Sequence, residues 1–454
     1  EEGEGLTLTD MKVPENNLQA YVELAAAEYP EQSPKQKAIR YNDIEFIDAP
    51  AFRGFLISYT YINIEDRCYT SRIDRLPVGS GATSIGDLRV EPGDWEPLFE
   101  SRPCLAFNPE RDLIVGYMAG GRMAFKEPDL LYFGNGEYHL DGIHRRDAGI
   151  QDDASDYGKT IEIDLATGES RVFSKGHRNL QGVAVDTEGR LWTTEHGMRG
   201  GDELNLVRDG ENYGWPLENL GTLYSGIPAA TVGSVGRHEV HAPPVYAWLP
   251  SAAVSSLAVV DGFHEAWDGD LLIGSLRGET LFRARIRDER LVFLEEIPIG
   301  VRIRDVMQMG PTKIALWLDT EEIAVLEIEP RRDPLEGVAD LLVEEGVDVA
   351  LAESAVDVLA GCAECHSYEK DVHAAGPSLH RVVGREIAST AFGSHSPALS
   401  EASGAWDRAR LAAYLADPEQ VIVGTGMTGL GIGDETLAAT VVQALELMYR
   451  SDGE

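Results

Sequence analysis

The chain has 454 residues, a length that predicts two or three domains rather than a single core. Its 43% hydrophobic and 26% charged residues are typical of a globular protein, and no uninterrupted apolar run is long enough to span a membrane. The formal net charge of −38 argues against nucleic acid and anionic membranes as partners. Such a charge is typical of a solvated surface adapted to salt, or of one that steers a basic electron-transfer partner.

Between about residues 40 and 330 the sequence consists of short β-rich runs separated by Gly, Asp and Asn turns. They include RDLIVGYMAG (111–120), LLYFGNGEY (130–138), KTIEIDLATGESRVF (159–173), GRLWTTEHG (189–197), DLLIGSLRGETLFRARI (270–286) and KIALWLDTEEIAVLEIE (313–329). Many short strands without helices between them indicate a sandwich, barrel or propeller. Hairpin turns at 166–168 and near Gly278 favour propeller blades. At roughly 40–50 residues a blade, the length favours about six blades.

The pattern changes in the charged segment 329–354, after which amphipathic helical spacing begins. We therefore predict an all-β six-bladed propeller at 1–332, a linker at 333–352 and a small all-α domain at 353–454. Helices are expected within 355–366, 407–420 and 434–454.

The stretch GCAECHSYEK (361–370) contains Cys362, Cys365 and His366 in Cys-x-x-Cys-His spacing. Two thiols at this spacing can form thioethers to one haem c while the adjacent imidazole reaches its iron; a redox Cys-x-x-Cys beside a chance histidine is the alternative. Covalent haem attachment takes place outside the cytoplasm, which predicts a periplasmic or secreted protein. The opening EEGEGLTLTD has no export signal, so any signal is expected to have been removed or never to have existed. Cys68 and Cys104 are either a disulfide or two unrelated buried thiols.

The C-terminal domain resembles class I cytochrome c along nearly its whole length. The resemblance rests on AGPSLHRVVGRE, FGSHSPAL, Trp406 and YLADPEQVIVGTGM. It implies that His366 and Met427 are the axial ligands of the haem iron, whereas Met448 is expected in the core. His/Met ligation fills both axial positions, so it predicts electron transfer rather than oxygen activation.

The segment GHRNLQGVAVDTEGRLWTTEHGMRGGDELNLVRDGENYGWP (176–216) resembles the soluble glucose and aldose sugar dehydrogenases that use pyrroloquinoline quinone (PQQ), which are six-bladed propellers. Further matches are GSLRG (274–278) and RIRD (302–305). The resemblance implies PQQ binding by Arg178, Asn179, Gln181, Arg277, Arg302 and Arg304; Arg277 stands where the glucose enzymes have Lys. It also implies a Ca²⁺ ion on the backbone carbonyls of Gly197 and Met198, where relatives have Gly-Pro.

The chain departs from this family at the general base. In MAGGRMAF, Met118 stands at the position of the family's histidine, and a thioether cannot take a hydroxyl proton. Asn135 replaces a carboxylate just downstream. His139, Asp141 and His144 are candidate substitutes for the base, although each could be a plain loop residue.

These features predict a quinohaemoprotein oxidoreductase. It would oxidise a sugar or related alcohol with PQQ and pass electrons through haem c to an external acceptor, such as a soluble cytochrome or other redox protein. The alternative is a propeller that lacks quinone catalysis and serves as a docking platform for the cytochrome.

Overall fold

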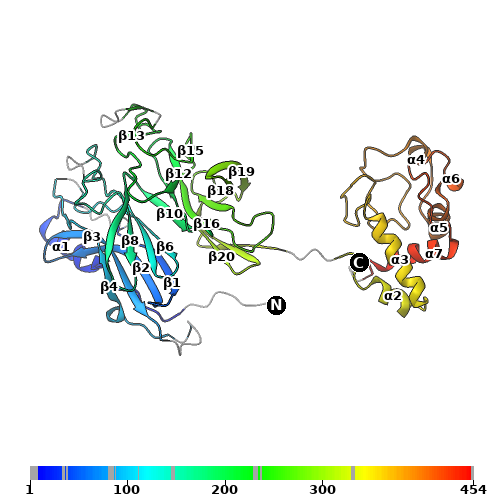
Figure 1. Ribbon diagram of the computed structural model, residues 1–454, viewed down its shortest axis with the longest axis horizontal. Coiled ribbons are helices and arrows are strands. Elements are labelled where there is room, and N and C mark those ends of the chain that lie inside the picture. Colours follow the sequence, from blue (N-terminus) through cyan, green and yellow to red (C-terminus); the bar gives the residue numbers. More distant parts are fainter. Residues whose placement is uncertain are drawn as a thin grey trace. The chain divides into compact units, whose positions relative to one another are not determined.

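The computed structural model describes residues 9–32, 36, 39–79, 86, 88–110, 112–144, 149–228, 234–235, 238–328 and 333–450. The chain divides into two compact units, residues 1–328 and 329–454 (Figure 1). Residues 329–332, at the predicted end of the propeller, lie outside the described residues. Within the described part, no helix is both long and apolar enough to cross a membrane.

In the first unit, helix α1 (Leu18–Glu28) precedes five main antiparallel sheets. The first contains β1 (Tyr41–Asp48), β2 (Arg53–Asn63), β3 (Cys68–Pro77), β4 (Glu96–Glu100) and the short β5 (Leu105–Ala106); the second contains β6 (Gly120–Lys126), β7 (Leu130–Asn135), β8 (Lys159–Asp164) and β9 (Ser170–Lys175). The third contains β10 (Leu180–Val185), β11 (Leu191–Glu195), β12 (Asp202–Val207) and β15 (Tyr246–Trp248). The fourth contains β16 (Val254–Val259), β17 (Leu271–Ser275), β18 (Thr280–Arg287) and β19 (Arg290–Pro298); the fifth contains β20 (Ile303–Met309), β21 (Lys313–Leu318) and β22 (Ile323–Glu327). Strands β13 (Glu218–Asn219) and β14 (Ser234–Val235) form a separate parallel pair.

These sheets form a propeller in which the first strand of each sheet packs on the first strand of the next, in the order β1, β6, β10, β16, β20 (Figure 1). The described residues form five blades, so the prediction of six was wrong. The prediction divided the length of the domain by the average number of residues in a blade, but two blades carry long insertions. The first spans residues 41–106, and the third spans 180–248 with β13 and β14 inside it.

The hairpin turns have a local cause. Asp164 ends β8 and accepts hydrogen bonds from the backbone N–H groups of Ala166 and Thr167, at 2.8 and 2.9 Å. Gly168 follows at φ 76°, a conformation that favours glycine. In contrast, the described residues 112–119 of RDLIVGYMAG form no strand; Leu113 and Ile114 are buried in a loop that packs against α1.

Long-range contacts join the first blade to its neighbours. Arg122 of β6 donates hydrogen bonds to Asp43 of β1 at 3.2 Å and to Asp305 of β20 at 2.6 Å, and thus ties the first, second and last blades together.

Cys68 and Cys104 form a disulfide within the first blade, which resolves the alternative left open by the sequence.

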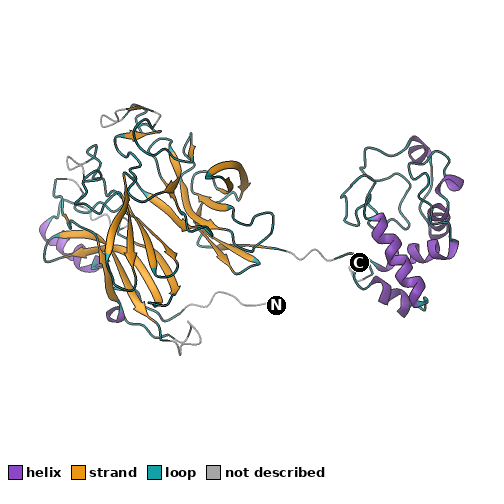
Figure 2. Ribbon diagram, viewed as in Figure 1, coloured by secondary structure: helices purple, strands orange, loops and turns teal. Residues whose placement is uncertain are grey.

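The second unit is built of helices and loops (Figure 2). Its helices are α2 (Val338–Glu344), α3 (Val349–Cys362), α4 (Pro397–Glu401), α5 (Arg408–Ala416), α6 (Pro418–Val421) and α7 (Glu435–Leu447). Asp348, Asp407 and Asp434 cap α3, α5 and α7 by accepting hydrogen bonds from the free N–H groups of the first turn.

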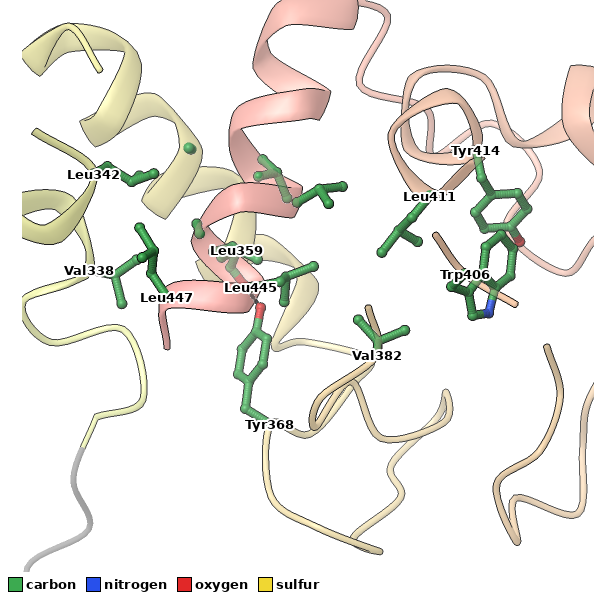
Figure 3. Packing of buried hydrophobic residues seen from close by; sticks show 14 of the residues in the cluster. Val338, Leu342, Leu359, Tyr368, Val382, Trp406, Leu411, Tyr414, Leu445 and Leu447 are labelled. Atoms are coloured by element: carbon green, nitrogen blue, oxygen red, sulfur yellow. Dashed lines mark hydrogen bonds between the residues drawn. The ribbon is translucent and has the colours of Figure 1, made fainter. Parts of the chain in front are cut away.

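These helices enclose one apolar core (Figure 3). Leu359 of α3, Leu411 of α5 and Leu445 of α7 are all buried in it. Helix α2, within the segment expected to be a linker, also contributes to it through the buried Val338 and Leu342.

Candidate functional site

The Cys-x-x-Cys-His motif lies at the end of α3, beside an apolar cavity in the second unit. Cys362 and His366 line this cavity together with Met427 from the loop after α6. Its walls include Leu379, Val382, Leu399, Trp406, Leu411, Tyr414 and Leu415. Among the described residues, the thiols of Cys362 and Cys365 are free of disulfide bonds.

The ring of His366 is held in one orientation. Its Nδ1 lies 2.7 Å from the carbonyl oxygen of Pro377, so Nδ1–H donates and the lone pair is on Nε2. The ring lies against Gly376, where an added Cβ would stand 2.4 Å from Cε1. Glycine is therefore needed there to leave room for the imidazole.

Haem fits this site. Two free thiols stand at the motif's spacing, an oriented imidazole and a thioether line the same cavity, and the walls are apolar. Apolar walls and a hydrogen-bonded histidine ligand are the means by which a protein tunes a haem iron.

In the propeller, the start of β6 connects the two groups of residues expected to bind PQQ. On one side, Asn179 Oδ1 accepts hydrogen bonds from the Gly120 N–H at 3.3 Å and from Gln181 Nε2 at 3.1 Å. On the other side, Arg122 donates to the Arg304 carbonyl at 3.2 Å. The start of β6 is therefore bonded both to residues at the start of β10 and to β20.

The guanidinium groups of Arg302 and Arg304 are partly exposed, and both bind Asp319. Arg302 Nε lies 3.0 Å from one carboxylate oxygen of Asp319, and Arg304 Nε lies 2.5 Å from the other. The hydrogen bond from Arg304 holds the pKa of Asp319 below its ordinary value. Two partly exposed guanidiniums at the start of β20 suit a ligand with several carboxylates, which is the chemistry of PQQ. Arg277 lies in the exposed turn between β17 and β18.

Arg178, by contrast, is 3% exposed and points into the protein. Its Nη1 donates to the carbonyl of His196 at 3.0 Å and also to the carbonyl of Gly197. Because a guanidinium already occupies the Gly197 carbonyl, the expected Ca²⁺ ion does not fit there beside Arg178. The Met198 side chain is buried in the core, and its backbone is bridged to Gly200. The described residues contain no group of three or more His, Cys, Asp or Glu side chains arranged to hold a metal ion.

Met118 and Asn135, two positions where the chain departs from the dehydrogenases it resembles, both make hydrogen bonds within the fold. The Met118 carbonyl accepts a hydrogen bond from the Tyr138 N–H at 3.1 Å. Asn135 is buried and donates to Ser101 at 3.0 Å and to the Asp156 carbonyl at 2.7 Å. Neither side chain can remove a proton from a hydroxyl group.

The loop after β7 brings together the three candidate substitutes for the base. His144 Nδ1 lies 2.7 Å from Asp141 Oδ2, and the backbone N–H groups of Ile143 and His144 donate to Asp141 Oδ1. The hydrogen bond that His144 donates to Asp141 raises the pKa of His144. Burial would raise the pKa of Asp141, but the hydrogen bonds from His144 outweigh it and the pKa is lowered.

His139 stacks on His144 with ring centroids 4.4 Å apart. Burial, aided by His144, lowers the pKa of His139 to about 4, so this imidazole is neutral at neutral pH. In this loop, His144 is therefore hydrogen-bonded to a carboxylate, and His139 beside it is neutral.

Sequence reasoning missed the residues that hold the arginines. Glu137 and Trp215 flank Arg178, and Asp319 binds Arg302 and Arg304. Asp319 stands in a strand-end turn, where an aspartate is expected for turn formation alone. Glu137 lies two residues after Asn135, where the chain departs from the dehydrogenases it resembles, and this could have drawn attention to it. That its carboxyl group is buried, however, cannot be predicted from a single sequence.

Fold and site together define a class: a β-propeller with arginines at its inner strands, followed by a helical unit with a cavity suited to haem. Residues 105–327 match the glucose/sorbosone dehydrogenase family. The chain is 30% identical over 307 residues to the aldose sugar dehydrogenase YliI of Escherichia coli, covering 63% of this chain and 77% of that protein. The chain belongs to the glucose/sorbosone dehydrogenase family.

The second unit has relatives of its own. It is similar to a cytochrome c homolog of Rickettsia bellii, with 34% identity over 125 residues that cover 27% of this chain and 72% of that protein.

Among solved structures, a glucose dehydrogenase matches this chain with a TM-score of 0.53 and 28% identity, covering 62% of this chain and 81% of that one. The chain spans only 60% of the length of another curated relative, an uncharacterized protein of Synechocystis.

Proposed function

We propose that this protein is a quinohaemoprotein dehydrogenase that oxidises a sugar or related alcohol and delivers the electrons through its own haem c to an external redox protein. The observation that carries the proposal is the presence, in one chain, of a propeller of the sugar dehydrogenase family and a cavity lined by Cys362, His366 and Met427. Tethering the two replaces a diffusional encounter by an intramolecular one, at an effective concentration in the millimolar range.

The cofactors are assigned by the donor groups. Arg302, Arg304, Asn179 and Gln181 would hold the carboxylates and carbonyls of PQQ; Cys362, Cys365, His366 and Met427 would hold haem c. When bound, PQQ supplies a two-electron acceptor for an alcohol and haem c a one-electron carrier. Ca²⁺ at Gly197 and Met198 has no step in this proposal, since Arg178 binds the Gly197 carbonyl.

His144 is the proposed general base, and Asp141 orients it. A neutral imidazole whose Nδ1–H is bound by a carboxylate carries its lone pair on Nε2, as in other carboxylate-oriented histidine bases. This assignment accounts for the loss of histidine at Met118, because the base would come from the neighbouring loop.

Periplasmic or secreted localisation is part of the proposal. The Cys68–Cys104 disulfide and the haem attachment motif both suit an oxidising compartment. The external acceptor would be a redox protein, and the net charge of −38 favours a basic one.

The function is tested by following haem absorption in the purified protein during addition of PQQ and a panel of aldoses and alcohols. We expect haem reduction that requires both PQQ and a substrate. Arg304→Gln should weaken PQQ binding about tenfold or more and leave the haem spectrum unchanged. A normal haem spectrum with no PQQ binding would favour the alternative, a docking platform without quinone chemistry, which Met118 and Asn135 support.

The base is tested separately. His144→Gln should lower kcat by about 10²–10⁴-fold. The base must be neutral to act, so activity should rise as pH increases through the His144 pKa. Since the hydrogen bond that His144 donates to Asp141 raises that pKa, Asp141→Asn should move the rise to lower pH as well as reduce kcat. The exposed His264 provides a control, and equal effects of His264→Gln and His144→Gln would refute the assignment.

A further inference from the structure

The corner formed by the carbonyls of His196 and Gly197 already contains a cation. Arg178 Nη1 donates to both carbonyls. The Arg178 backbone is fixed on both sides: its N–H donates to Glu195 Oε2 at 2.7 Å, and its carbonyl accepts from the Glu137 N–H at 3.0 Å. The guanidinium is therefore placed by the scaffold and not by a flexible side chain alone.

Two further side chains enclose this guanidinium. Its Cζ lies 5.4 Å from the centroid of the Trp215 ring. Glu137 Oε1 lies 3.9 Å from Arg178 Nε, and Glu137 Oε2 accepts a hydrogen bond from Trp215 Nε1 at 2.8 Å. Glu137 is completely buried. An aromatic face and a carboxyl group are the surroundings that stabilise a buried guanidinium.

The carboxylates nearest this corner are bound by protein donors. Glu195 accepts from Asn205 at 2.8 Å as well as from the Arg178 backbone. Glu218 accepts from His241 Nδ1 at 2.9 Å and from backbone N–H groups. The cavity beside Arg178 has a volume of about 20 Å³, enough for about one water molecule. A Ca²⁺ ion needs six to eight oxygen ligands, and neither the space nor the charge beside Arg178 suits one.

We propose that the guanidinium of Arg178 is the resident cation of this corner and takes the place there of a calcium ion. Arg178 is a positioning residue: it binds the carbonyls of His196 and Gly197 and holds this part of the pocket in shape without metal. Only the cofactor-binding arm of the test rests on the proposed function.

The first arm needs no cofactor. The full-length haem protein is freed of Ca²⁺ with EGTA, and the melting temperature of its propeller is measured by calorimetry with and without millimolar Ca²⁺. Removal of the guanidinium in Arg178→Gln leaves two carbonyls without a cation. We expect this variant to melt lower than the wild type and to regain about 2–4 °C on addition of Ca²⁺, beyond any rise in the wild type.

Arg283 provides a matched control. It too is buried: its Cζ lies 4.9 Å from the Trp267 centroid, and its Nη1 lies 3.1 Å from both the Ala266 carbonyl and Asp270 Oδ2. Arg283→Gln should also melt lower, but without an added response to Ca²⁺. Equal Ca²⁺ responses in the wild type and both variants would overturn the proposal.

The second arm uses PQQ as the probe, titrated into the wild type once in EGTA and once in excess Ca²⁺. The expected result is the same Kd, within about threefold, in both conditions. Binding that is tighter by a factor of ten or more in Ca²⁺ would overturn the resident-cation proposal. No PQQ binding in either condition would count against the proposed function, and the calorimetric arm would then decide the proposal by itself.

Discussion

Replacement of Gly376 by alanine tests whether the His366 ring is packed as the structure has it. A Cβ at this position would lie 2.4 Å from Cε1, 2.7 Å from Nδ1 and 2.9 Å from Nε2 of the imidazole. Ordinary contact with a Cβ begins at 3.4 Å, so the ring must retreat by about 1 Å.

A shift of about 1 Å takes the 2.7 Å hydrogen bond between Nδ1 and the Pro377 carbonyl out of hydrogen-bonding range. Loss of that bond costs about 0.5–1.5 kcal/mol, and the overpacking costs about 1–3 kcal/mol. We therefore expect the second unit to lose about 1.5–4.5 kcal/mol in its free energy of unfolding. Because metal ligands tolerate displacements of only about 0.2 Å, we also expect weakened iron ligation.

The assay combines haem absorption, redox potentiometry and denaturant unfolding of the full-length protein. Gly361→Ala is the matched control, since this glycine lies in α3 and nothing lies within 4 Å of an added Cβ. That variant should be as stable as the wild type or more stable by about 0.5–1 kcal/mol. A Gly376→Ala protein with the spectrum, midpoint potential and stability of the wild type would refute the packing of His366 described above.

Three further predictions concern other parts of the chain. Met427→Leu removes the thioether from the cavity proposed to hold haem and should lower the haem midpoint potential, whereas Met448→Leu at the end of α7 should leave it unchanged; equal potentials would refute the ligand assignment. Burial raises the pKa of Glu137 from 4.5 to about 8, so its contribution to stability is present below pH 4.5 and is lost as pH rises through 8. Glu137→Gln should remove roughly 3–5 kcal/mol of that pH dependence in urea unfolding; an unchanged slope would contradict the assignment. The disulfide closes a loop with a sequence separation of 36, so the double variant Cys68→Ser/Cys104→Ser should lower the free energy of unfolding by about 4 kcal/mol, and a stability equal to wild type would exclude this linkage.

The sequence by itself predicted the features that depend on residues close to one another along the chain. The Cys-x-x-Cys-His spacing places Cys362 and His366 beside each other at a helix end, because one helical turn brings them together. The turn after Asp164 was predicted for a similar reason, since the side chain binds the next N–H groups along the chain. The family resemblance likewise rested on contiguous motifs and is confirmed by the match over residues 105–327.

Only the tertiary structure decided how distant residues meet. Five blades instead of six result from insertions whose lengths have no local signal, and the pairing of Cys68 with Cys104 depends on β3 and β5 lying side by side. The sequence also does not show that the guanidinium of Arg178 lies beside Trp215 and the carbonyl of His196. Hydrophobic periodicity and motif spacing encode which face of an element is buried. They do not encode which charged group it meets there, because that depends on the long-range packing of separate blades.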